Sequence, residues 1–277
     1  MKNNKLNFIF WGTPDVASET LEILKGNGYM PSLIITAPDK PQGRKMIITP
    51  PAVKVWAIKN NIPYLQPEEL KKEMEVILKA SLQADFSIVV AYGKIIPENI
   101  INLPRLGFIN IHYSLLPKYR GASPVESAIL NGDKETGITI QKIEYKMDTG
   151  HVMAKEKVKI GNEEKAPDLR KRLIKIGGEL LVKILPDFID EKIKLFPQNE
   201  SEATYCKKIN KEDGLVNLAT ESPNVLYNKF RAYAIWPRTF FFENGKRIII
   251  TDAVLENRQF KILKIIPENG KETSYTK

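Results

Sequence analysis

The sequence has few of the side chains that build disulfides and metal sites. Its 277 residues include one cysteine, Cys206, and two histidines, His112 and His151. One cysteine cannot form an internal disulfide, and neither a Cys-x-x-Cys pair nor a His-Glu-x-x-His motif occurs. We therefore expect no metal, and a chain without disulfides fits the reducing cytoplasm.

Long apolar runs and phosphate-binding motifs are also missing. No run approaches the roughly 20 residues that a helix needs to span a bilayer, so we expect no membrane span. The first apolar run ends at Gly12, Pro14 and Asp15, which predicts a strand and a turn and not a signal peptide. Neither Gly-x-Gly-x-x-Gly nor Gly-x-x-x-x-Gly-Lys-Ser/Thr is found, so dinucleotide and P-loop sites lack their usual motif.

Positive charge is in excess over negative charge. The chain has 42 lysine and arginine residues against 33 aspartate and glutamate residues, a net charge of +9. Such a surplus favours anionic ligands or nucleic acid as partners. A lysine-rich surface is also often only a solvated surface, so the charge alone does not decide between these interpretations.

Short apolar runs alternate with amphipathic stretches along the first part of the chain. This order is typical of the α/β class, and it predicts a Rossmann-like, mostly parallel sheet with helices on both faces. The periodicity predicts strands over 6–12, 31–37, 85–93 and 107–113, and helices over 15–28, 52–61, 67–83 and 122–133. An antiparallel pair over 135–145 and 151–160 and a long helix over 166–190 follow.

The composition changes near residue 191. Residues 191–205 are polar and break the apolar period, which predicts a linker. A helical stretch and three strand-like runs follow, at 238–245, 246–255 and 258–267. We therefore expect a large α/β domain over 1–190, a linker over 191–205 and a small C-terminal β-domain over 206–277.

His112 lies on a predicted strand together with Asn110. Side chains alternate faces along a strand, so both residues share one face of GFINIHY (107–113), about 7 Å apart. They lie at the carboxyl end of their strand, where open α/β sheets bind ligands. Both side chains can donate to an oxyanion, and histidine can carry a proton near neutral pH. The spacing alone leaves a structural histidine as the commoner alternative, and it places His151 on the surface or at a site rim.

A catalytic histidine usually needs a carboxylate that fixes its tautomer and accepts charge. Asp148 is the strongest candidate, because Met-Asp-Thr-Gly (147–150) predicts a tight corner between two strands. Asp133 and Glu135 are alternatives, although both fall in the polar turn NGDKETG (131–137), which is typical of solvated surface.

Several motifs resemble one known family. The segment NIHYSLLPKYRGASPVESAILNGDKETGITI followed by MDTG is similar to the formyltransferases that use 10-formyltetrahydrofolate. FWGTPD, PDKPQGR with TPPAVK, and VVAYGKIIP fit the same family and occur in its order. The resemblance covers about residues 6–160. The FWGTP and PDKPQGR segments are most similar to the family members that act on methionyl-tRNA.

The resemblance implies the chemistry of the site. It implies that Asn110, His112 and Asp148 form the catalytic trio, with 10-formyltetrahydrofolate as co-substrate and no metal. It also implies that two segments form walls of the folate pocket, namely Val89, Val90, Ala91, Tyr92 and Gly93, and Ser114, Leu115, Leu116 and Pro117.

The resemblance further implies initiator methionyl-tRNA as the acceptor in translation initiation. We also expect the protein to be a cytoplasmic monomer without membrane contact. The loop over 38–54 would approach the acceptor end of the tRNA, with Arg44 and Lys45 as its basic members. The C-terminal domain would be an OB-like barrel, shortened in this chain, in which Lys207 and Lys208 supply phosphate contacts.

Two other functions stay open at this point. A sugar N-formyltransferase would use the same asparagine, histidine and aspartate but would formylate an amino sugar on a nucleotide. A non-catalytic RNA-binding protein could keep the fold, but it would have no need for all three of these residue types.

Overall fold

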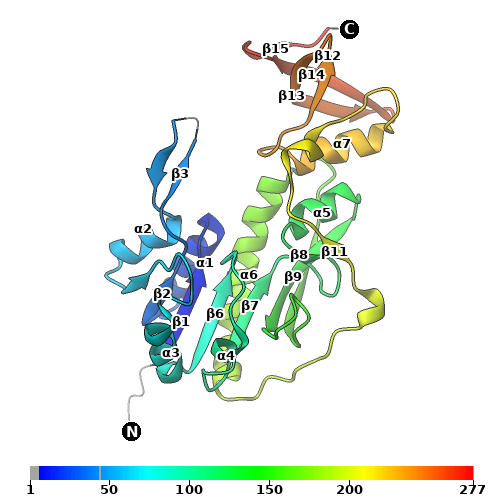
Figure 1. Cartoon of the computed structure of the whole chain (residues 1–277). Coiled ribbons are helices and arrows are strands. Elements are labelled where there is room, and N and C mark those ends of the chain that lie inside the picture. The colour runs from blue at the N-terminus through cyan, green and yellow to red at the C-terminus, as the bar shows by residue number, and fades with distance from the viewer. Residues whose placement is uncertain (1–5, 44, 277) are drawn as a thin grey trace. The chain divides into compact units, whose positions relative to one another are not determined.

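The computed structural model of the chain describes residues 6–43 and 45–276 (Figure 1). The chain forms two compact units, each assembled from separate stretches of sequence. The first unit consists of Met1–His112, Ile138–Glu156 and Ile174–Ser201, and the second of Tyr113–Gly137, Lys157–Leu173 and Glu202–Lys277.

A seven-stranded sheet organises the α/β part of the chain, in the order β10-β9-β7-β6-β1-β2-β5. Strands β5, β2, β1, β6 and β7 run parallel to one another, and β9 pairs with β7 antiparallel. The predicted mostly parallel sheet is therefore confirmed. The strands are β1 (Phe8–Gly12), β2 (Leu33–Ile35), β5 (Tyr64–Leu65), β6 (Phe86–Val90), β7 (Phe108–His112), β9 (Glu135–Lys142) and β10 (Val152–Lys159).

Helices flank this sheet. They are α1 (Asp15–Gly26), α2 (Ala52–Lys59), α3 (Met74–Gln83), α4 (Glu98–Ile101) and α6 (Ala166–Ile189). Helix α3 begins seven residues later than the 67–83 period predicts. The reason lies in Lys94, whose Nζ donates to the carbonyl oxygens of Pro67 and Glu68 at 2.7 and 2.8 Å and so holds this segment in a turn.

The alternation of side chains along β1 explains why both faces of the sheet are covered. Ile9 and Trp11 belong to a buried cluster that also contains residues of α3 and α4. Phe8, on the other face, stacks on Phe86 with ring centroids 5.3 Å apart, and Phe86 contacts Phe188 of α6 edge to face at 5.5 Å. A strand buried on both faces must be apolar throughout, as the run FIFWG is.

The segment predicted as a loop over 38–54 contains a β-hairpin instead. Strands β3 (Lys40–Gln42) and β4 (Ile47–Thr49) pair antiparallel, and Figure 1 shows the hairpin projecting from the parallel strands. Both strands are short and solvent-exposed, so neither has the buried apolar face by which a strand is recognised in a sequence.

The second unit contains helices α5 (Pro124–Leu130) and α7 (Pro223–Ala232) and an antiparallel sheet. The sheet has the linear order β12-β13-β14-β15, with bounds Phe240–Glu243, Lys246–Glu256, Gln259–Pro267 and Thr273–Ser274. Leu226 and Phe230 of α7 pack against Ile248 and Ile250 of this sheet. The small C-terminal β-domain is therefore confirmed, with one short strand more than the sequence predicted.

Two short strands, β8 (Arg120–Gly121) and β11 (Tyr205–Cys206), pair within the second unit. Gly121 has a φ of 121°, and a Cβ there would lie 2.2 Å from the carbonyl oxygen of Cys206. This pairing therefore requires glycine at position 121.

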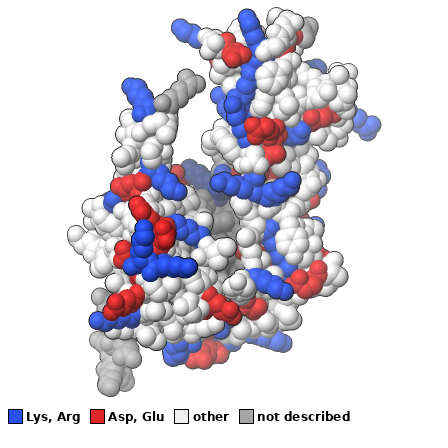
Figure 2. All heavy atoms as spheres, viewed as in Figure 1, with Lys and Arg blue, Asp and Glu red and all other residues white. Residues whose placement is uncertain are grey.

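The surface is charged and mixed. Figure 2 shows lysine and arginine side chains spread over the viewed face with aspartate and glutamate among them. Within residues 6–43 and 45–276, no helix is both long enough and apolar enough to cross a membrane.

Candidate active site

Strand β7 carries Asn110 and His112, and its two neighbours fix their surroundings. In the sheet register Asn110 lies beside Val89 of β6 and Gln141 of β9, while His112 lies opposite Thr139. The two side chains point to the same face because they are two residues apart. His112 is the last residue of the strand, and its side chain is only 6% exposed.

Asp148 reaches this face from the corner between β9 and β10. Its Oδ1 lies 3.6 Å from Nδ1 of His112, and its side chain is 12% exposed. The alternatives lie elsewhere, in the second unit. Asp133 accepts a hydrogen bond from the Tyr119 hydroxyl at 2.8 Å, and Glu135 pairs with Lys157 at 3.0 Å. Within the first unit, the structure thus brings Asp148 to His112.

The corner that carries Asp148 is tightly folded. Asp148 has a φ of 54°, and Thr149 donates to the carbonyl oxygen of Lys146 from both its backbone N–H and its hydroxyl. A Cβ on Gly150 would lie 1.7 Å from the carbonyl oxygen of Lys142. Only glycine allows the chain to approach β9 this closely.

Two glutamines complete the surroundings of the carboxylate. Nε2 of Gln141 donates to Oδ1 of Asp148 at 3.0 Å, and Nε2 of Gln198 lies 3.3 Å from Oε1 of Gln141. Sequence reasoning missed both. Gln141 could have been noticed in the sequence, because it is a polar residue that directly follows the apolar run GITI. Gln198 lies in the polar segment 191–205, where a further polar residue does not stand out.

This arrangement can stabilise a negatively charged oxygen and move a proton. Asn110 and His112 can donate hydrogen bonds to one atom from the same face, which is how an oxyanion is stabilised. The carboxylate of Asp148 beside the imidazole can orient the ring and accept charge. In the described ranges 6–43 and 45–276, no cluster of three or more His, Cys, Asp or Glu side chains could hold a metal ion.

The first predicted folate wall, Val89–Gly93, ends β6. Ala91 and Gly93 are exposed and have φ values of 46° and 79°. The Tyr92 side chain turns into the core, where it meets Trp11 edge to face at 5.3 Å, and burial raises the pKa of its hydroxyl to about 12. At this residue only the backbone is available to a ligand.

The second predicted wall, Ser114–Pro117, belongs to the second unit. Ser114 and Leu116 are buried, and the Ser114 hydroxyl donates to the carbonyl oxygen of Lys118. Leu115 is the member whose side chain is partly exposed. The segment therefore offers one aliphatic side chain and its backbone.

The predicted tRNA-binding residues are divided between the two units. Lys45 is exposed in the β3–β4 hairpin of the first unit, while Arg44 lies outside the described residues. Lys207 and Lys208 are exposed just after β11 in the second unit. Within the described part of the chain, none of these three lysines forms an ion pair.

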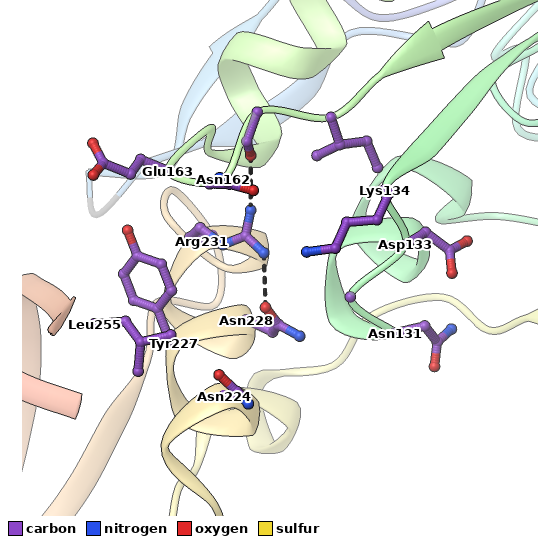
Figure 3. A pocket seen from close by; sticks show the side chains of 13 residues that line it. Asn131, Asp133, Lys134, Asn162, Glu163, Asn224, Tyr227, Asn228, Arg231 and Leu255 are labelled. Carbon is purple, nitrogen blue, oxygen red and sulfur yellow. Dashed lines mark hydrogen bonds between the residues drawn. The ribbon is translucent and has the colours of Figure 1, made fainter. Parts of the chain in front are cut away.

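The second unit also contains a polar pocket of about 680 Å³, lined by one face of α7 and by the turns 131–134 and 160–163 (Figure 3). Its floor is Arg231, which is 6% exposed. Burial lowers the pKa of this guanidinium, which donates to the carbonyl oxygens of Gly161 and Glu164 and to Oδ1 of Asn228. These bonds hold α7 against the turn, so Arg231 has a structural role.

His151 lines a separate hollow of about 650 Å³ in the first unit. Its Nδ1 lies 2.6 Å from Oε1 of Glu144, and both side chains are 45% exposed. The prediction that His151 lies on the surface or at a site rim agrees with this exposure.

The chain matches two family models. The model described as formyl transferase matches residues 4–185, and the model described as formyl transferase, C-terminal domain, matches residues 208–272. The chain is 38% identical to the methionyl-tRNA formyltransferase of Sulfurihydrogenibium sp. over 270 residues, which cover 96% of this chain and 86% of that protein. It is 40% identical to the protein of the same name from Nitratiruptor sp. over 265 residues, which cover 94% and 85% of the two chains.

Solved structures with the same fold are more distant in sequence. An N-formyltransferase from Helicobacter canadensis, in complex with folinic acid and dTDP-3-aminofucose, superposes with a TM-score of 0.69 at 21% identity. The superposition covers 91% of this chain and 88% of that chain. At this identity the likeness shows the fold alone.

We predict that Gly150→Ala destabilises the protein strongly. The added Cβ would overlap the Lys142 carbonyl oxygen, so we expect the free energy of unfolding in urea to fall by more than about 2 kcal/mol. Gly26→Ala is the matched control, because a Cβ there meets nothing within 4 Å; it should raise the free energy by about 0.5–1 kcal/mol. Equal effects of the two substitutions would contradict the steric argument.

Proposed function

We propose that this chain, which belongs to the formyl transferase family, transfers a formyl group from 10-formyltetrahydrofolate to the methionine amino group of initiator methionyl-tRNA. The observation that carries the proposal is the convergence of Asn110, His112 and Asp148 on one face of the first unit. The relatives that bear the methionyl-tRNA name match this chain over most of its length and theirs.

The reaction has modest requirements that these residues meet. The methionine nitrogen attacks the formyl carbon, a new C–N bond forms, and the bond from that carbon to N10 of the folate breaks. Asn110 and His112 donate to the oxygen that becomes negative during the attack. An α-amino group titrates near 7.7–8.0, so roughly a tenth to a sixth of it is unprotonated at pH 7. Asp148, directly or through His112 or a water, accepts the proton that the amine loses, and this proton passes on to N10 as the bond from the formyl carbon to N10 breaks.

The chemistry of each predicted folate wall, taken by itself, suits a pterin. A pterin is flat, and its edge carries hydrogen-bonding groups that backbone N–H and C=O groups can match. Ala91 and Gly93 are exposed in the first unit, and we assign their backbone N–H and C=O groups to this role. In the second unit, Leu115 provides a partly exposed aliphatic surface.

The acceptor is inferred from charge as well as from family. Lys45, Lys207 and Lys208 are exposed and unpaired within the described residues, and phosphates are the natural partners of such side chains. Translation initiation takes place in the cytoplasm, which is where we place the enzyme. One chain carries all three proposed catalytic side chains, so a monomer suffices for activity.

We also propose a functional division of the chain into a catalytic domain (1–190), a linker (191–205) and a tRNA-contacting C-terminal domain (206–277). The two compact units are made of alternating stretches of the sequence, so they do not coincide with these three parts. The proposed division describes what each part of the chain does, not which parts fold compactly together.

The acceptor is tested by offering the protein two substrates. We expect formyl transfer from 10-formyltetrahydrofolate to methionyl-tRNA and none to a nucleotide-linked amino sugar, both followed with labelled formyl donor. Transfer to the sugar alone would replace our proposal with a sugar N-formyltransferase. Binding of tRNA without transfer to either substrate would indicate a non-catalytic RNA-binding protein.

The catalytic trio is tested by substitution. His112→Ala and Asp148→Asn should each lower kcat for methionyl-tRNA formylation by roughly 100-fold or more, because each removes a group that acts on the proton or the oxyanion. Far-UV circular dichroism should stay unchanged. His151→Ala is the control, since this exposed histidine faces Glu144 and not Asp148. Rates near the wild-type rate for either catalytic variant would remove that residue from the mechanism.

The phosphate contacts are tested by the salt dependence of tRNA affinity. The logarithm of the association constant should fall linearly with the logarithm of salt concentration, and Lys207→Ala and Lys208→Ala should each reduce the slope by about one. Lys192→Ala is the control. The hydrogen bond between Lys192 and Asp190, at 2.8 Å, raises the pKa of Lys192, so this lysine already has a carboxylate as its partner. An unchanged slope in the first two variants would exclude these lysines from the tRNA interface.

A further inference from the structure

We infer that Gln141 and Gln198 are positioning residues for catalysis, which orient the Asp148 carboxylate toward His112. The inference rests on the proposed function and deepens it. Neither glutamine lies in a motif that carries the family resemblance, and Gln198 belongs to the segment 191–205, outside both matched family regions.

The contact between Asp148 and His112 does not fix the carboxylate by itself. The separation of 3.6 Å between Oδ1 and Nδ1 is longer than a good hydrogen bond. The same oxygen accepts a hydrogen bond of 3.0 Å from Nε2 of Gln141. This donor therefore holds the carboxylate in place, where the Asp148 side chain is only 12% exposed.

Gln141 is itself held in one orientation. Its side chain is 2% exposed, and a buried amide needs partners for both its oxygen and its nitrogen. The oxygen faces the Gln198 amide nitrogen at 3.3 Å, and the nitrogen faces Asp148. A flipped amide would place its oxygen against the carboxylate oxygen and its nitrogen against the Gln198 nitrogen, so both neighbours favour the orientation in which Gln141 donates to Asp148.

Gln198 also holds the backbone of the corner. Its Nε2 lies 2.8 Å from the carbonyl oxygens of both Asp148 and Gly150. Two residues earlier, Phe196 exchanges backbone hydrogen bonds of 2.8 and 3.0 Å with Val152 of β10. Gln198 is therefore anchored at the edge of the sheet. It contacts the main chain of Asp148 directly, and it contacts the Asp148 side chain indirectly, by way of Gln141.

A hydrogen-bond network that positions Asp148 should affect the rate of the chemical step, whereas a network that only stabilises the fold should not. Asp148 has a positive φ and sits on a turn, whereas Asn110 and His112 sit on a central strand. Misplacement of a catalytic group by about 1 Å can cost 100-fold in rate. Loss of the glutamine donors should therefore lower kcat and alter the pH profile, with little effect on binding.

Four variants test the inference in the methionyl-tRNA formylation assay. Gln141→Met keeps the volume of the side chain but removes the donor, and Gln198→Glu keeps its shape but replaces the donor with an acceptor. Each should lower kcat by roughly 10- to 100-fold, with KM for both substrates within about 3-fold of wild type.

Gln141→Glu places a second carboxylate beside Asp148, which favours protonation of the pair. The acidic limb of the pH–rate profile of this variant should therefore move to higher pH. Gln83→Glu is the control, because this glutamine is exposed at the end of α3.

The outcomes are distinguishable. Wild-type kcat in Gln141→Met and Gln198→Glu, or a loss that tracks the unfolded fraction with an unshifted profile in Gln141→Glu, would overturn the inference while leaving the proposed function in place. Absence of transfer by the wild-type protein to either acceptor would overturn the proposed function, and this inference with it.

Discussion

The antiparallel pairing of β9 with β7 is the constraint on which the candidate site depends. This register places Gln141 opposite Asn110 and Thr139 opposite His112, and the corner after β9 then returns the chain to the same face. Side chains alternate along a strand, so a slip of one residue would turn Gln141 away from the site and move the corner with it. The buried apolar residues of β9, such as Ile138 and Ile140, oppose that slip, because it would move them from their apolar packing to the polar face that carries Gln141. The packing of the core thus sets the geometry of the polar site.

A close approach of backbone to backbone completes the arrangement. Gly150 brings the corner against the Lys142 carbonyl oxygen, and the positive φ of Asp148 aims its side chain at His112. A positive φ costs free energy in a residue other than glycine, and a close backbone approach leaves no room for a side chain. They persist because the flanking strands and the hydrogen bonds from Gln198 determine the path of the chain on either side. The site therefore combines two side chains on a rigid strand with one on a constrained turn.

The parts of this structure that sequence analysis predicted are those with a period or a motif. Continuous apolar runs located the parallel strands, and alternation put Asn110 and His112 on one face. Asp148 was found because a Met-Asp-Thr-Gly corner between strands is a local signal. The start of α3 was missed because the turn before it depends on Lys94, 26 residues away from Glu68. The 40–49 hairpin was missed because its strands have no buried apolar face. Gln198 was missed because its hydrogen-bond partners lie about 50 residues earlier in the chain. Interactions between distant polar residues leave no local pattern.

The position of Gln198 bears on where the functional part of the chain ends. A catalytic fragment that stopped at residue 190 would contain the three proposed catalytic side chains, yet it would lack the group that orients Gln141 and holds the corner carbonyl oxygens. It would also leave the edge of β10 without its partner Phe196. A buried polar group that loses its hydrogen-bond partner destabilises the fold. Here the groups that would lose a partner are the Gln141 amide oxygen and the carbonyl oxygens of Asp148 and Gly150, which surround the carboxylate. The segment that follows α6 is therefore part of the site in a physical sense, although its composition is that of a connection.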